Sequence, residues 1–216
     1  MSFQPVVNAM IKDESVAAFL DQLASRASTP GGGSAAAIMG AMGAALVSMV
    51  CNLTIGKEKY AAVEDEMKAL VAESENLRAD LTAHVNADVQ AFDQVMAAYG
   101  LPKGDDAEKA ARTAAIQTAL RTATEVPLAC ARSCAAAIAL SRRAAELGNP
   151  NVISDAGVAV MAAYAGLKSA ALNVYINVGA LKDEAFATAA RNEIEALVAA
   201  GEAATPEIYA IVRARL

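Results

Sequence analysis

The sequence predicts an all-α protein: a single-domain bundle of long helices, spanning residues 1–216, around central buried helices rich in alanine and glycine. About a quarter of the chain is alanine, the residue with the highest helix propensity. Aromatic residues make up only 4% and tryptophan is absent, which is poor material for strands. Hydrophobic residues make up 56%, so the chain can bury a core and is not of the disordered class.

The first half of the chain is predicted to hold three helices. The apolar spacing in residues 13–27 indicates a short amphipathic helix with Asp13 as its N-cap. The segment STPGGGS, residues 28–34, ends it. Residues 35–56 then form a helix without a single charged side chain, and residues 57–99 follow as one long amphipathic helix or as two.

The second half is predicted to hold four helices, over residues 107–147, about 154–179, 183–203 and 206–215. The first of them should be kinked or split before Pro127, because proline removes a backbone hydrogen bond. The second begins at Ser154 or Asp155 and carries only Asp155 and Lys168 as charges. Two nearly charge-free helices therefore lie among amphipathic ones.

The charge-free helix of residues 35–56 is long enough to cross a bilayer. Ser48 and Asn52 interrupt it, however, aromatic anchors are missing, and the next helix is highly charged. We therefore favour a helix buried by protein on every side, away from membranes. A domain of this size supplies such neighbours best by forming a homodimer.

The net charge of −6 and the pI near 4.9 argue against a nucleic-acid partner, because such proteins carry a basic stripe. Here the basic residues are scattered, and Arg142 and Arg143 are the only adjacent pair. The first residues lack a basic stretch followed by an apolar one, so no secretory signal is predicted and a cytoplasmic location is expected.

The cysteines are predicted to be buried thiols and not metal ligands. Cys130 and Cys134 share a helical face, and Cys51 lies in the charge-free helix. A structural zinc ion normally needs four ligands, and the only histidine, His84, lies elsewhere, at the predicted surface of an amphipathic helix. We expect no metal and no cofactor.

The glycine-rich turn before the first charge-free helix is the strongest local signal. Gly31, Gly32 and Gly33 allow backbone N–H groups to face a ligand, and the following helix presents an electropositive N-terminus. The turn lacks the Lys-Ser/Thr of a phosphate-binding loop, and no strand precedes it. A plain helix start with Ser34 as N-cap explains the pattern equally well, so both interpretations stay open.

Polar side chains also precede the second charge-free helix: Asn149, Asn151, Ser154 and Asp155. Asp155 is either a helix cap favoured by the helix dipole or a carboxylate at the rim of an apolar pocket, suited to proton transfer.

Further candidates lie inside the predicted helices. Asn173 and Asn177 share one face of a buried helix, where an amide is costly unless it is paired, so they indicate a polar track for a ligand or partner helix. Asp88 and Asp93 lie on different faces of the long helix, so one can be functional and the other solvated. Lys57 begins that helix and is either functional or part of a solvated face.

Seven segments together resemble the cyclodeaminase/cyclohydrolase family of folate enzymes. In family order they are PGGGS (30–34), MGAALVSMV (42–50), LTIGK (53–57), DVQAF (88–92), GN (148–149), SD (154–155) and NVYIN (173–177). The amino-acid sequences of several segments are most similar to those of the stand-alone bacterial methenyltetrahydrofolate cyclohydrolases. The resemblance implies a helical homodimer that binds folate in a cleft near the subunit interface.

The implied reaction is the opening of the ring of 5,10-methenyltetrahydrofolate by water, which gives 10-formyltetrahydrofolate. The methenyl carbon is already electrophilic, so the reaction needs an oriented water and a base. Asp155 or Asp88 is the expected base, with Lys57 as proton relay. The remaining candidates would hold the folate or orient water: Gly31, Gly32, Gly33, Ser34, Asn149, Asn151, Ser154, Asn173 and Asn177.

Two alternatives remain open. Formimidoyltetrahydrofolate cyclodeaminase closes the same ring and expels ammonia through a tetrahedral centre at the same carbon. A non-catalytic, folate-binding helical dimer is the alternative outside the enzymes. Whichever holds, the hypothesis requires that the polar groups at the mouths of the two charge-free helices meet in space.

Overall fold

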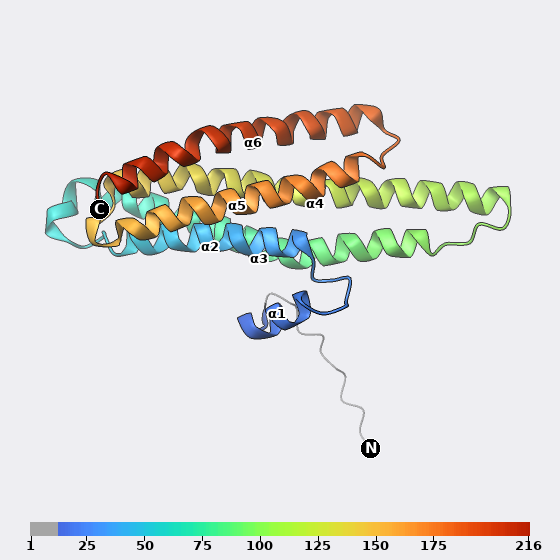
Figure 1. The fold of residues 1–216 in the computed structure, drawn as a ribbon, viewed down its shortest axis with the longest axis horizontal. Coiled ribbons are helices and arrows are strands. Elements are labelled where there is room, and N and C mark those ends of the chain that lie inside the picture. Colours follow the sequence, from blue (N-terminus) through green and yellow to red (C-terminus); the bar gives the residue numbers. More distant parts are fainter. Residues whose placement is uncertain (1–12) are drawn as a thin grey trace, which may run out of the picture.

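The structure is a computed structural model that describes residues 13–216, and it contains six α-helices (Figure 1). Their bounds are α1 Val16–Leu23, α2 Gly32–Asn52, α3 Glu64–Tyr99, α4 Asp106–Leu147, α5 Ile153–Val178 and α6 Glu184–Arg213. Two short 3₁₀ helices, η2 Glu58–Val63 and η3 Pro150–Val152, lead into α3 and α5. Residues 13–216 contain no strand, so the predicted all-α class is confirmed. The segment searched for a secretory signal lies largely outside these residues.

Helices α2 to α6 run along the long axis of the molecule, while α1 lies apart on one side (Figure 1). Helices α2 and α5 pack against each other, α3 covers α2 and α4, and α6 covers α4 and α5. The core is built from small side chains: Ala36, Ala44, Ala156, Ala159 and Ala163 are fully buried. The predicted central alanine- and glycine-rich helices are therefore confirmed.

Helices α2 and α5 run antiparallel with their backbones in near contact. A Cβ atom added to Gly43 would lie 2.9 Å from the backbone carbonyl oxygen of Ala159 and 3.0 Å from the Cβ of Ala163. A Cβ atom added to Gly166 would lie 2.9 Å from the Ala36 carbonyl oxygen. Glycine is required at these positions because any side chain would push the two helices apart.

The Gly43→Ala substitution should destabilise the protein by about 1–3 kcal/mol, because the new methyl group overpacks a contact between two backbones. The measurement is urea unfolding at a fixed protein concentration. Gly179→Ala is the matched control, since an added Cβ there meets only ordinary contacts at 3.6 Å or more. Equal stability of the two variants would contradict the close approach of α2 and α5.

Both prolines inside the helices are accommodated without a break, which corrects the expected break before Pro206 and excludes a split of the helix at Pro127. Helix α4 runs through Pro127, and α6 runs through Pro206 where two helices were predicted. Pro127 cannot donate to the Ala123 carbonyl, but the Asn177 side chain donates to that oxygen at 2.6 Å. An amide from a neighbouring helix thus replaces the lost backbone bond in α4.

Three differences at helix ends and on the surface are local. The N-cap of α1 is Ser15, whose side chain accepts from the Ala18 N–H, and not Asp13. The predicted helix over residues 57–99 begins with a 3₁₀ turn and becomes α-helical at Glu64. His84 is half-buried and not a plain surface residue.

Three helical segments have the length and composition to cross a membrane: Gly32–Asn52, Asp106–Leu147 and Pro150–Val178. About half of the most apolar stretch of each is buried inside the bundle, namely 56%, 50% and 50%. Packing within the chain thus covers much of this apolar surface, and the rest faces outward.

Candidate functional site

The glycine-rich turn meets Asp88 of α3 at the N-terminus of α2. Gly31 is the N-cap, and Gly32, Gly33 and Ser34 form the first turn of the helix. Ser34 is fully buried, and its hydroxyl donates to Oδ2 of Asp88 at 2.9 Å. These five residues are called the glycine-turn cluster below. Ser34 is therefore not the N-cap of its own helix, which was one of the two interpretations of this turn. Its hydroxyl group holds the carboxyl group of Asp88 instead.

Gly33 leaves the space that the carboxyl group of Asp88 occupies. A Cβ atom at position 33 would lie 2.0 Å from Oδ1 of Asp88, which is far inside contact distance. The carboxyl group therefore lies directly over the first turn of α2, where the backbone N–H groups and the helix dipole favour negative charge.

The protonation of Asp88 is set by two opposing effects. Burial raises the pKa of its carboxyl group, and hydrogen bonds from the side chain and backbone of Ser34 lower it, with burial the larger effect. Asp88 forms no ion pair with any residue in the range 13–216. A half-buried carboxyl group with a raised pKa and no cation beside it is suited to accept and return a proton.

His84 lies one helical turn before Asp88 on α3, and the sequence analysis did not connect the two. Burial lowers the pKa of its imidazole, and Asp80 opposes this more weakly, so the ring is neutral at neutral pH. The i, i+4 spacing of His84 and Asp88 places both on one face of α3, which the sequence alone could have indicated.

Asn173 and Asn177 lie at the same end of the bundle as the glycine-turn cluster. The contacts of Gly40 with Gly166 and of Gly43 with Ala163 set the register of α2 and α5, and they place Asn173 level with Gly33. The Asn173 amide donates to the Ser169 carbonyl at 3.0 Å. Within the described chain neither asparagine Oδ1 accepts a hydrogen bond, so both acceptors remain available.

The other candidates lie at the opposite end of α2. Asn149 is buried and its side chain is used within the chain: Nδ2 donates to the Leu53 carbonyl at 3.0 Å, and Oδ1 accepts from the Tyr60 hydroxyl at 3.0 Å and the Asn151 N–H at 3.1 Å. This asparagine ties the end of α2 to η2 and to the turn before α5. Its structural bonds leave little of the side chain for a ligand.

Asp155, Ser154, Asn151 and Lys57 surround this same end. Asp155 is half-buried in the first turn of α5, whereas the other three are exposed. Neither Asp155 nor Lys57 forms an ion pair with another described residue. Both charges are therefore available to a ligand or to another chain.

Within one chain, the candidate residues at the N-terminal end of α2 lie far from those at its C-terminal end. Helix α2 has 21 residues, so its ends lie about 30 Å apart at 1.5 Å per residue. The glycine-turn cluster, Asn173 and Asn177 lie at one end, and Lys57 and Asp155 lie at the other. The expected meeting of these groups around one ligand is not found within a single chain, because α2 and α5 are antiparallel.

The structure is an all-helical bundle that holds a half-buried carboxyl group over a helix N-terminus, an arrangement that suits proton transfer. Within residues 13–216 no three His, Cys, Asp or Glu side chains are grouped to hold a metal ion. The three cysteines are free and buried as predicted, and burial raises the pKa of the Cys51 thiol to about 11.

The chain belongs to the formiminotransferase-cyclodeaminase family, whose model matches residues 15–196. It is 59% identical to the methenyltetrahydrofolate cyclohydrolase of Methylorubrum extorquens over 207 residues, which are 96% of this chain and 100% of that protein. It is 36% identical to the formimidoyltransferase-cyclodeaminase of Rattus norvegicus over 86% of this chain and 34% of that longer protein. The crystal structure of formiminotetrahydrofolate cyclodeaminase from Thermotoga maritima matches with a TM-score of 0.85 and 32% identity, over 94% of this chain and 98% of that one.

Proposed function

We propose that this protein is a methenyltetrahydrofolate cyclohydrolase, which hydrolyses 5,10-methenyltetrahydrofolate to 10-formyltetrahydrofolate. The Methylorubrum extorquens protein of that name aligns over its full length at 59% identity, which supports this activity. The structural observation that carries the proposal is the Asp88 carboxyl group, which Ser34 holds over the N-terminus of α2 and which forms no ion pair with residues 13–216.

In this mechanism Asp88 serves both halves of the reaction. Its carboxylate stabilises the methenyl amidinium cation and takes a proton from water as the oxygen–carbon bond forms. The protonated Asp88 then gives that proton to the ring nitrogen as its bond to the carbon breaks. The hydroxyl proton of the intermediate is released, so the net products are the formyl compound and one proton. A raised pKa suits both steps, since it eases protonation in the first and makes the acid available in the second.

Gly31, Gly32, Asn173 and Asn177 belong in this proposal as binding residues around Asp88. The first-turn amides of α2 suit a carbonyl or anionic group of the folate, and the free Oδ1 atoms of the asparagines suit N–H donors of the pterin ring.

The remaining candidates enter the site in this proposal from a second copy of the chain. The outer faces of α2 and α5 expose apolar side chains, among them Met42, Leu172 at 68% and Ile176 at 74%. Two copies joined through these same faces in antiparallel orientation form a two-fold homodimer. Lys57 and Asp155 of one copy then approach the glycine-turn cluster of the other, where Lys57 passes the proton of Asp88 on to the ring nitrogen. Asn149, Asn151 and Ser154 of that copy lie nearby.

The Leu172→Glu substitution should convert the dimer to monomers and lower the hydrolysis rate, because it buries a charge in the joined faces. Sedimentation velocity and turnover are measured together. Leu101→Glu, in the exposed turn between α3 and α4, is the control and should leave both unchanged. A Leu172→Glu variant that stays dimeric would place the interface elsewhere.

The proposal includes four statements about setting and partners. The chain acts as one domain, works in the cytoplasm, binds neither nucleic acid nor membrane, and needs no metal or cofactor beyond its folate substrate. The acidic net charge supports the absence of a nucleic-acid partner. The chemistry of an already electrophilic carbon supports the absence of a metal or cofactor.

The deciding experiment follows the absorbance of 5,10-methenyltetrahydrofolate in parallel with 5-formimidoyltetrahydrofolate as the other substrate. We expect the methenyl chromophore to disappear faster than it does spontaneously. The match to the Thermotoga maritima cyclodeaminase favours a second candidate activity. Appearance of the chromophore with release of ammonia from the formimidoyl substrate would indicate that activity instead. No turnover of either substrate would leave the non-catalytic dimer.

The Ser34→Ala substitution should move the acidic limb of the pH–rate profile to higher pH. The Ser34 hydrogen bonds lower the pKa of Asp88, so their loss raises that pKa further, and the ionised base is then present only at higher pH. The measurement is kcat/KM across the pH range. Ser141→Ala is the control, because that buried hydroxyl donates only to the Ala137 carbonyl. If the acidic limb of the profile does not move, Asp88 is not the group whose titration controls the rate.

A further inference from the structure

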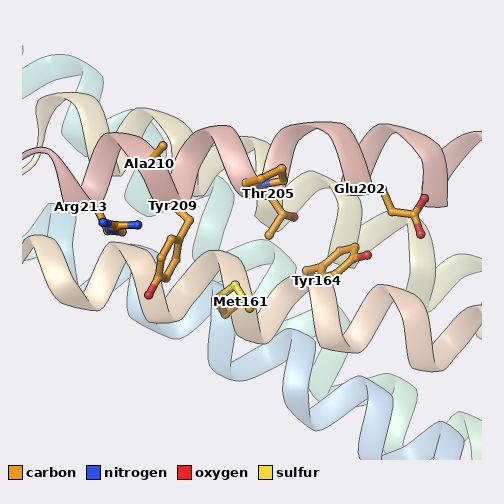
Figure 2. A pocket seen from close by; sticks show the side chains of 8 residues that line it. Met161, Tyr164, Glu202, Thr205, Tyr209, Ala210 and Arg213 are labelled. Carbon is orange, nitrogen blue, oxygen red and sulfur yellow. The ribbon is translucent and has the colours of Figure 1, made fainter.

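A cavity lies between α5 and α6, away from the glycine-turn cluster. It has a volume of about 430 Å³, and Figure 2 shows the side chains that line it. Met161 lies on α5 twelve residues before Asn173, which corresponds to about 18 Å along the helix axis. Helix α6 covers α4 and α5, whereas Asp88 belongs to α3, which covers α2 and α4. No residue of the proposed catalytic site lines this cavity.

The wall of the cavity contains a buried hydroxyl group without a partner. Thr205 is 5% exposed, and its Oγ1 makes no hydrogen bond within the described chain. Other buried hydroxyls behave differently: Thr124 donates to the Leu120 carbonyl and Ser141 to the Ala137 carbonyl, each at 2.8 Å. An unsatisfied buried hydroxyl costs stability, so a polar group that completes this bond would be favoured here.

The next residue removes a second hydrogen bond at the same place. Pro206 has no N–H to donate to the carbonyl of Glu202, and both residues line the cavity. In α4 the equivalent loss at Pro127 is repaired by the Asn177 side chain. No side chain in the described range repairs the loss in α6. The cavity wall therefore combines a hydroxyl group without a partner and a helical turn that has lost one backbone hydrogen bond, both suited to a ligand that carries N–H groups.

One end of the cavity is cationic and the middle is apolar. Figure 2 shows Arg213 at one end, the rings of Tyr209 and Tyr164 with Met161 between the ends, and Glu202 at the other end. Arg213 forms no ion pair with a described residue, whereas Glu202 is neutralised by Lys168. Glu202 and Arg213 are eleven residues apart on α6, so the cavity extends about 16 Å.

We propose that the cavity between α5 and α6 is a second ligand site, for an aromatic carboxylate that also carries N–H donors. The ring packs on Tyr164, Tyr209 and Met161, and the carboxylate pairs with Arg213. An N–H group donates to Thr205 Oγ1. This site is separate from the proposed hydrolysis at Asp88 and does not depend on it.

The test uses 4-aminobenzoylglutamate, which combines an aromatic ring, N–H donors and carboxylates, in calorimetric titration of the full-length protein. We expect saturable binding that Arg213→Gln weakens about tenfold or more and Thr205→Val weakens about fivefold. Thr205→Val should also leave Tm unchanged or raise it, because it removes an unsatisfied buried hydroxyl of nearly the same shape. Arg191→Gln and Thr188→Val, at exposed positions of α6 outside the cavity, should bind as the wild type does.

Three results overturn the proposal. The first is the absence of saturable binding. The second is binding that Asp88→Asn abolishes while Thr205→Val and Arg213→Gln leave it unchanged, which would place the molecule in the catalytic site. The third is dissociation of the dimer by Arg213→Gln in sedimentation velocity, which would mean that a second copy covers the cavity. Hydrolysis of the methenyl substrate is measured separately, so failure of the second site is distinguishable from failure of the proposed function.

Discussion

The Asp88→Asn variant should lose about 10²- to 10⁴-fold in turnover of 5,10-methenyltetrahydrofolate while remaining folded. The amide keeps the shape of the carboxyl group and can still meet the Ser34 hydroxyl, but it cannot take a proton from water or neutralise the amidinium cation. Turnover is followed by the loss of methenyl absorbance above the spontaneous rate. Circular dichroism and the urea midpoint establish that the fold is retained.

Two further carboxyl groups serve as comparisons for this variant. Asp93 is exposed on α3, five residues beyond Asp88, and Asp93→Asn should leave turnover unchanged. Asp155→Asn should lower turnover less than Asp88→Asn, because Asp88 takes the proton from water in the proposed mechanism, whereas Asp155 of the second copy only lies near the reacting atoms. A fully active Asp88→Asn variant beside an inactive Asp155→Asn variant would assign the base to Asp155 and reverse the proposed roles.

The Gly33→Ala variant should lose about 10²-fold in kcat/KM with little loss of stability. Its methyl group would lie 2.0 Å from Oδ1 of Asp88, so the carboxyl group must move by more than an ångström. Misplacement of a catalytic group on that scale costs about 10²-fold in rate. The half-buried carboxyl group can move toward solvent, and alanine favours the helix by up to about 1 kcal/mol. Steady-state kinetics and urea unfolding measure the two effects separately.

Gly32 provides a matched control for this prediction. It occupies the same first turn of α2, but a Cβ atom added there meets nothing within 4 Å. Gly32→Ala should therefore keep near-normal activity and gain slightly in stability. If both variants lose activity equally, the flexibility of the turn matters more than the position of Asp88, and the steric argument is wrong.

The helical class followed directly from composition, and the central position of α2 and α5 followed from their lack of charge. The continuity of α4 could not be predicted in the same way. It depends on Asn177, which lies 54 positions after the Ala123 carbonyl that it repairs. A proline rule applied along the chain describes only the lost bond, and the replacement comes from another helix.

The candidate site was predicted as a set of residues but not as an arrangement. The glycine turn and Asp88 were both selected, yet their contact joins positions 34 and 88 and was not visible in either segment. Asp155 and the glycine turn were expected to meet because each precedes a charge-free helix. The antiparallel packing of those helices sends the two helix starts to opposite ends, a consequence of topology that local patterns do not contain.

The near contact of α2 and α5 fixes the distance between the two polar ends of this helix pair. With Gly43 against Ala159 and Gly166 against Ala36, neither helix can slide by one turn, about 5.4 Å, without a backbone collision. The pair therefore behaves as a rigid spacer of constant length between its two polar tips. Any molecule that touches both tips meets a fixed separation, and it must adjust its own shape because the spacer does not change.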